Sequence, residues 1–108
     1  MPRASDAVVP WEKVVGYLLD LEHPAGASKA RYFRAHGYHS GNVAVLTAGL
    51  LRVASGEVAE QKESPFGRKY VIRGDLAAPR GTLLRVETIW IQLPGSSGPR
   101  LVTAYPCG

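Results

Sequence analysis

The hydrophobic period of this chain changes near Gly56, and the change decides the class of fold. Before Gly56, apolar residues recur at helical spacing; after it, they alternate as they do in half-buried strands. Helices segregated from a run of strands define the α+β class. The sequence therefore predicts an α+β fold in which three N-terminal helices pack on a three- to four-stranded antiparallel sheet.

The helical half is expected at about 10–56. Helices are predicted near 10–21, from Ser28 to His36, and from Asn42 to Gly56. Ser28 and Asn42 are residue types that cap helix N-termini. A His-Pro pair separates the first two helices, because the residue before a proline is disfavoured in the α region.

The sheet half is expected at about 57–106, and short turns between its strands indicate antiparallel neighbours. The predicted strands cover residues 57–63, 69–76, 82–93 and 100–105. In the second strand, Tyr70 and Ile72 share one parity, while Lys69 and Arg73 share the other. The third strand has apolar residues on both parities, which predicts either a central strand covered on both faces or a bulge near Glu87.

The length of 108 residues predicts a single domain covering residues 1–108. The single cysteine, Cys107, excludes an internal disulfide, and no apolar run approaches the roughly 20 residues that span a bilayer. The N-terminus lacks the apolar core of a cleaved signal. We therefore expect a cytoplasmic protein that does not contact a membrane.

The positive charge of the chain is unevenly distributed. The net charge is +4, and no acidic residue occurs between Glu22 and Glu57. A second basic group follows, made of Arg68, Lys69 and Arg73. Clusters of one sign favour an anionic partner such as RNA, although solubility alone also explains a mild positive charge.

The second predicted helix carries the clearest candidate for anion binding. Its spacing places Lys29, Tyr32, Phe33 and His36 on one face, where a cation could hold a phosphate and an aromatic ring could stack a base. In the simpler alternative, Phe33 faces the core and the basic groups form a solvated rim.

His23 follows the first predicted helix and could either cap its terminal carbonyls or transfer a proton. The three histidines have no zinc-like spacing with carboxylates, so we expect no metal site. Phosphate-loop and dinucleotide-binding motifs are absent from the sequence, and we expect no cofactor.

Several motifs together resemble a family of small bacterial domains of unknown function. The resemblance extends over residues 8–106, nearly the whole chain. The motifs are Tyr17-Leu18-Leu19, His23-Pro24-x-Gly26-x-x-Lys29-Ala30-x-x-Phe33, Gly37-Tyr38, Pro65-Phe66-Gly67-x-Lys69-Tyr70-x-Ile72-x-Gly74, Val86-x-Thr88-x-Trp90 and Pro99-Arg100-Leu101-Val102-Thr103-Ala104-Tyr105-Pro106.

The chain also resembles, more distantly, the ribonuclease fold of barnase, EndoU, colicin D and RelE toxins. Those proteins place helices before a four-stranded antiparallel sheet and cleave RNA without a metal. The resemblance implies the catalytic candidates His23, Lys29, Lys69, Thr88, Arg100 and Thr103. The nucleic-acid-binding candidates are Tyr32, His36, Arg68 and Arg73. The histidine or tyrosine that such proteins carry late in the sheet is matched only by Tyr105.

These observations favour an RNA-binding or metal-independent RNA-cleaving domain of toxin-nuclease type. The alternative is a non-catalytic module, immunity-like or accessory, that binds a protein. Either kind of domain could form a homodimer through an exposed edge strand. Whether the chain is an enzyme is left open by the sequence.

Overall fold

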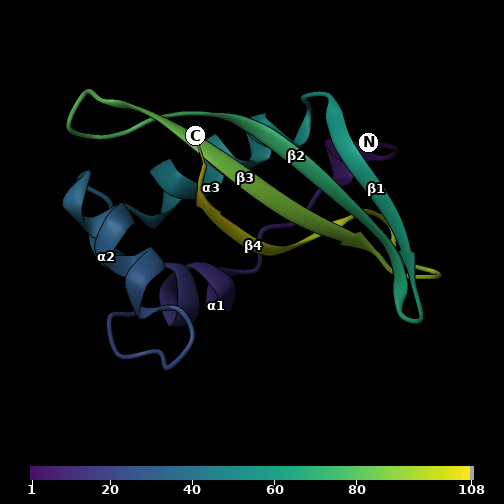
Figure 1. Cartoon of the computed structure of the whole chain (residues 1–108), viewed down its shortest axis with the longest axis horizontal. Coiled ribbons are helices and arrows are strands. Elements are labelled where there is room, and N and C mark those ends of the chain that lie inside the picture. The colour runs from purple at the N-terminus through teal and green to yellow at the C-terminus, as the bar shows by residue number, and fades with distance from the viewer. Residues whose placement is uncertain (108) are drawn as a thin grey trace.

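The computed structural model describes residues 1–107 and confirms the α+β fold. Its helical segments are η1 (Ala4–Asp6), α1 (Trp11–Lys13), the π-helical turn η2 (Val14–Leu18), α2 (Ala27–Ala35), η3 (Ser40–Asn42) and α3 (Val43–Ala54). Its strands are β1 (Val58–Ser64), β2 (Gly67–Ala77), β3 (Leu83–Gln92) and β4 (Arg100–Pro106). Figure 1 shows the strands side by side, with α3 behind them.

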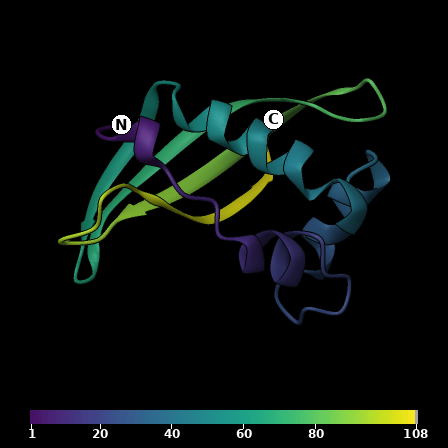
Figure 2. The same cartoon turned by 180° about the vertical axis from the view of Figure 1, so that it is seen from behind.

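The four strands form one antiparallel sheet in the order β1-β2-β3-β4. Short turns connect them, as expected, because each strand folds back on its predecessor. The outer edge of β4 is partly occupied by Val8, whose N–H donates to the Pro99 carbonyl at 2.8 Å. The opposite edge is β1, whose middle residues are exposed. Figure 2 shows α3 in front of the sheet, so the helices cover one face of it.

The face uncovered by helices, hereafter the open face, carries one parity of each long strand. Tyr70 and Ile72 are buried on the covered face, whereas Lys69 and Arg73 lie on the other, as the alternation predicts. In β3 the register places Ile89 and Ile91 on the open face beside residues of β2. They are only half-buried, so the expectation of a strand covered on both faces was wrong.

The register of the sheet shifts at two places, between Val58 and Glu60 in β1 and between Ile89 and Trp90 in β3, the second just past Glu87. Ile89 pairs with Thr103 and Trp90 pairs with Leu101, so Val102 is the additional residue in β4. An extra residue changes the parity of the strand. Arg100, Thr103 and Tyr105 therefore all face the open side, although they are not evenly spaced.

The first helix is shorter than predicted. It begins at Trp11 and ends at Leu18 rather than near residue 21. Its second half is a π-turn in which the Leu19 N–H donates to the Val14 carbonyl, five residues back, at 2.9 Å. Tyr17 lies in this turn. Such turns are rare and often occur at functional sites.

The predicted caps are only partly right. α2 begins after Gly26, so Ser28 lies inside the helix rather than at its N-cap. Asn42 precedes α3, but its side chain accepts from the His39 N–H at 2.8 Å and donates to the Gly37 carbonyl at 2.9 Å. Gly37 has φ 101°, a conformation that suits glycine after a helix. Asn42 therefore ties the α2–α3 connection together instead of capping α3.

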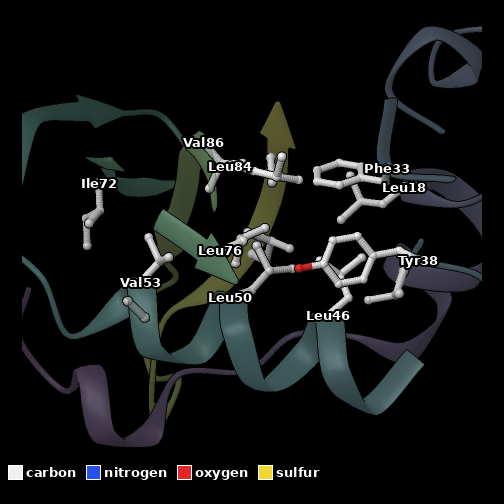
Figure 3. Packing of buried hydrophobic residues seen from close by; sticks show 14 of the residues in the cluster. Leu18, Phe33, Tyr38, Leu46, Leu50, Val53, Ile72, Leu76, Leu84 and Val86 are labelled. Atoms are coloured by element: carbon white, nitrogen blue, oxygen red, sulfur yellow. The ribbon is translucent and has the colours of Figure 1, made fainter. Parts of the chain in front are cut away.

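The core lies between the helices and the covered face of the sheet. Figure 3 shows Leu46, Leu50 and Val53 of α3 pointing toward the strands, with Phe33 and Tyr38 at one end of the cluster. All five side chains are buried. The apolar stripe of α3 thus holds the helical half on one face of the sheet, and the open face is not covered by this helix.

Thr88 belongs to this core, which corrects its assignment as a catalytic candidate. It is fully buried on β3. Its hydroxyl donates to the Ile72 carbonyl at 2.7 Å and accepts from the Trp90 indole N–H at 2.8 Å. A threonine enclosed in this way cannot reach a substrate, and its polar atoms are already satisfied.

We expect Thr88→Val to lower the free energy of unfolding by about 1–3 kcal/mol, because the buried indole N–H of Trp90 would lose its acceptor. Urea denaturation measures this change. The control is Thr47→Val on α3, a half-buried position that we expect to change stability by only about 0.5 kcal/mol. An unchanged midpoint for Thr88→Val would contradict the structural role.

Candidate functional site

Tyr17 joins two of the predicted catalytic residues at the β4 side of the open face. The Lys29 ammonium donates to the Tyr17 hydroxyl oxygen at 2.5 Å, and the Thr103 hydroxyl lies 3.3 Å from the same oxygen. The His23 ring packs edge-on against the Tyr17 ring, with centroids 4.9 Å apart. We call these four residues the Tyr17 cluster. It brings together side chains from η2, the following loop, α2 and β4.

The loop before α2 holds the cluster in place. His23 Nδ1 accepts from the N–H groups of Ala25 and Gly26, each at 3.1 Å. His23 therefore stabilises the turn that leads into α2, rather than capping the end of the first helix as the capping alternative proposed. A Cβ at Gly26 would lie 2.9 Å from the Tyr17 ring, so only glycine permits this close approach. Since Nδ1 is an acceptor, the neutral imidazole carries its hydrogen on Nε2.

The positive groups around Tyr17 make its phenol more acidic. Burial opposes ionisation, but the hydrogen bonds with Lys29 and Thr103 and the charges of Lys29 and Lys13 outweigh it, so the pKa of Tyr17 lies below its ordinary value. The Lys29 and Lys13 ammonium groups lie 4.9 and 5.3 Å from the centre of the ring. A lowered pKa increases the fraction of phenolate, which is the form of Tyr17 that can accept a proton.

We expect Lys29→Met to raise the pKa of Tyr17, because the substitution removes both a hydrogen bond and a positive charge. Ultraviolet titration of phenolate absorbance measures it, with Tyr17→Phe subtracted to isolate this residue. A lowered pKa in the folded state stabilises the fold above the ordinary tyrosine pKa, and this contribution is lost as pH falls through the folded pKa. Lys29→Met should reduce that alkaline stabilisation; identical titrations would contradict the contact.

Glu87 forms a second group on the open face, beside the Tyr17 cluster. Its carboxylate accepts from Arg73 Nε at 2.8 Å and from the Tyr105 hydroxyl. The Glu87 side chain is only 13% exposed. Lys29 lies 6.0 Å from the centre of the Tyr105 ring, which connects the two groups. Arg73 is therefore partly neutralised, and it orients Glu87 instead of standing free for a phosphate.

A groove of about 480 Å³ opens beside the Tyr17 cluster. Its lining includes Lys13, Tyr17, His23, Ile91, Leu93 and Arg100. His23 and Arg100 both line this groove, whereas Lys29 is not among its lining residues. Lys69 lines a different hollow of about 340 Å³, shared with Glu87 and Tyr105 farther along the open face.

The other predicted nucleic-acid contacts lie outside the cluster. Tyr32 packs on His36 with ring centroids 5.0 Å apart, and His36 Nδ1 lies 3.2 Å from the Thr82 hydroxyl. These contacts tie α2 to the turn before β3. Arg68 forms an ion pair with Glu63 near the β1–β2 turn. The structure therefore brings His23, Lys29, Arg100 and Thr103 to one region but leaves Tyr32, His36 and Arg68 elsewhere.

Sequence reasoning missed Tyr17, Lys13 and Glu87. Tyr17 has helical spacing with the aliphatic residues Val14, Leu18 and Leu21, and a phenol among them is the only signal that the sequence offers. Lys13 lies four residues before Tyr17, a helical spacing that places the two side chains together. Glu87 gave no signal, because its partners Arg73 and Tyr105 come from neighbouring strands.

Two further findings concern residues 1–107. No three His, Cys, Asp or Glu side chains in this range gather closely enough to hold a metal ion. None of the helices in the same range is both long and apolar enough to cross a membrane.

Comparison with known proteins shows a likeness in fold to a solved structure and membership of a family. The chain resembles one chain of a contact-dependent growth inhibition toxin–immunity protein complex from Klebsiella pneumoniae 342, with a TM-score of 0.77 and 14% identity over 100% of this chain and 99% of that one. At this identity the likeness is one of fold. No curated protein matches the sequence. The family model for a domain of unknown function, DUF6883, matches residues 1–108, so the chain belongs to that family.

Proposed function

We propose that this chain is one component of a toxin–immunity type protein pair. The observation that supports this is the likeness in fold, over the full length of both chains, to a chain solved in such a complex. This comparison supports a protein partner more directly than it supports RNA cleavage. Taken alone, the comparison therefore supports the protein-binding alternative better than the nuclease interpretation, and support for RNA cleavage comes from the site.

We further propose that the chain is the toxin-type component and cleaves RNA. The observation that carries this assignment is the Tyr17 cluster, in which a lysine, a phenol of lowered pKa and a threonine hydroxyl, all half-buried, converge at the β4 side of the open face. An immunity protein needs a complementary surface but no such group of proton-transferring side chains. Cations near a phosphate stabilise the charge that develops on its oxygens during cleavage.

The cluster suggests a specific division of roles. Tyr17 acts as the phenolate and takes the proton of an RNA 2′-hydroxyl, and the 2′-oxygen then forms a bond to the adjacent phosphorus. The bond from phosphorus to the 5′-oxygen breaks, and that oxygen takes a proton from the Lys29 ammonium. The Thr103 hydroxyl donates to the phosphoryl oxygen. Tyr17 returns its proton to Lys29 along their hydrogen bond, which leaves a 2′,3′-cyclic phosphate and a 5′-hydroxyl end.

Incubation of the purified chain with total tRNA and rRNA in EDTA tests this proposal. We expect cleavage products that end in a 2′,3′-cyclic phosphate, and we expect induced expression of the chain to arrest bacterial growth. Cleavage that stops in EDTA would contradict the metal-independent mechanism. Absence of both cleavage and growth arrest would contradict the toxin-type assignment.

The second candidate is a non-catalytic, immunity-like module. The open face offers a surface for a protein, since Val71, Ile89 and Val102 are half-buried apolar side chains around the hollow that Lys69 lines. This candidate predicts that the chain protects cells from a cognate toxin and does not harm them. Protection by the Tyr17→Phe and Lys29→Met variants would favour it, because a binding surface tolerates these substitutions better than a catalytic cluster does.

A further inference from the structure

The groove beside the Tyr17 cluster, hereafter the basic groove, has a polar rim and an apolar floor. Lys13 lies on its α1 side and Arg100 at the start of β4. Ile91, Leu93 and Val102 supply apolar surface between them. A volume of about 480 Å³ lies within the range of small-ligand sites.

The two cations on the rim are available to a ligand. Four ion pairs occur within residues 1–107, and neither Lys13 nor Arg100 belongs to any of them. Arg100 is exposed, and Lys13 is half-buried against the Tyr17 ring. Glu12 is the only acidic residue in the lining, so the groove has a net positive charge. An anion would gain from both cations without having to break an ion pair.

The basic groove is continuous with the proposed cleavage site, because Tyr17 belongs to both. The Tyr17 ring contributes to the groove wall, while its hydroxyl holds Lys29 and approaches Thr103. A chain of nucleotides that places one phosphate at Lys29 can therefore continue past Tyr17 into the groove. The apolar floor could receive a base only if that base were unpaired, since a duplex keeps its bases stacked inside.

We propose that the basic groove binds a nucleotide flanking the scissile linkage of a single-stranded RNA, with its phosphate at Lys13 and Arg100 and its base against Ile91 and Leu93. This assignment rests on the proposed RNA function and names its substrate class. It adds Lys13 and the apolar floor to the site and gives Arg100 a binding role instead of a catalytic one.

The test is the salt dependence of binding to a non-cleavable probe. A fluorescein-labelled 2′-O-methyl RNA of about 12 nucleotides lies within the range that small domains cover. The slope of log K against log salt is negative, and each lost phosphate contact reduces its magnitude by about 0.7 for a single strand. We expect Lys13→Ala and Arg100→Ala each to reduce the magnitude of the slope by about this amount and the double variant by about twice as much.

Arg31→Ala is the matched control, because Arg31 is an exposed cation of α2 outside the groove lining. It removes the same charge and should leave the slope unchanged. The slope also separates a phosphate contact from a structural role, since a variant that only loosens the fold lowers affinity at every salt concentration alike. Thermal unfolding of each variant checks that the fold is intact.

Trp11 gives a second, local readout. It lies between Pro10 and Glu12, which both line the groove, and is 64% exposed, whereas Trp90 is fully buried. Probe binding in the groove should therefore change tryptophan emission in the unmodified chain, and Trp11→Phe should abolish that change.

The outcomes separate this inference from the function on which it rests. Binding with reduced slopes for Lys13→Ala and Arg100→Ala supports the groove, even if the chain fails to cleave unmodified RNA. If Lys13→Ala and Arg100→Ala bind the probe with the same slope as Arg31→Ala, the assignment of the basic groove is overturned, but the proposed RNA function is not. Absence of probe binding by the unmodified chain, even at low salt, overturns both the groove and the proposed RNA function.

Discussion

Lys29→Met is expected to lower the rate of RNA cleavage at least about 100-fold, which is the scale of losing a group that transfers a proton. The Lys29 ammonium bonds the Tyr17 oxygen at 2.5 Å and is the nearest cation to it. The substitution keeps the aliphatic stem but removes the charge, so a smaller fraction of Tyr17 is ionised at neutral pH and the phosphate loses its cation. Single-turnover cleavage of a defined RNA measures the rate.

The matched control is Arg31→Ala on the same helix. Arg31 is exposed, and we expect its loss to change the rate by less than about threefold, since charge alone has a small and salt-dependent effect at an exposed site. Equal losses for Lys29→Met and Arg31→Ala would indicate a general effect of charge. Full activity in Lys29→Met would exclude Lys29 from the chemistry.

Phe33→Ala is expected to lower the free energy of unfolding by about 3–5 kcal/mol, the usual cost of emptying a buried phenyl site. Phe33 is fully buried and packs edge-on against Tyr32 and Tyr38, with ring centroids 5.5 and 6.0 Å apart. It anchors α2, the helix that carries Lys29. The variant should therefore also weaken RNA cleavage under conditions in which the chain remains folded.

Urea denaturation measures the loss, with Leu51→Ala as the control. Leu51 lies on α3 and is 37% exposed, so truncation there removes less buried surface and should cost about 1 kcal/mol. Phe33→Ala with the stability of Leu51→Ala would show that α2 is held by other contacts. Reduced stability with unchanged cleavage would show that Lys29 keeps its position without the Phe33 anchor.

The strands were predicted well because alternation is a local property. The assignment of Tyr70 and Ile72 to one face and Lys69 and Arg73 to the other required only the period of two. A bulge was expected near Glu87 in β3, but the extra residue is Val102 of β4, because a bulge depends on how β4 pairs with β3. The wrong assignment of Thr88 as a catalytic candidate has the same cause. A threonine can lie in an active site or in a core, and the burial of Thr88 depends on which residues pack against it in the folded chain.

The first helix shows where local reasoning fails within the helical half. Its apolar spacing continues to Leu21, but the helix ends at Leu18 after a π-turn. This turn places Tyr17 against Gly26 and beneath Lys29, contacts that involve a loop and a second helix. Periodicity cannot describe such a turn, since its extra residue is stabilised by packing outside the segment.

The amino-acid sequence by itself determined the class of fold, the faces of β2 and the residue types available for chemistry, since these follow from hydrophobic period and composition. It also named Lys29, Thr103, His23 and Arg100 as candidates. Only the tertiary structure decided that Tyr17 joins Lys29 to Thr103, that Thr88 is enclosed, and that Arg100 and Lys13 share a groove. Those relations depend on the packing of α1, η2 and α2 beside β4, which brings together Tyr17 and Thr103, 86 positions apart in the sequence.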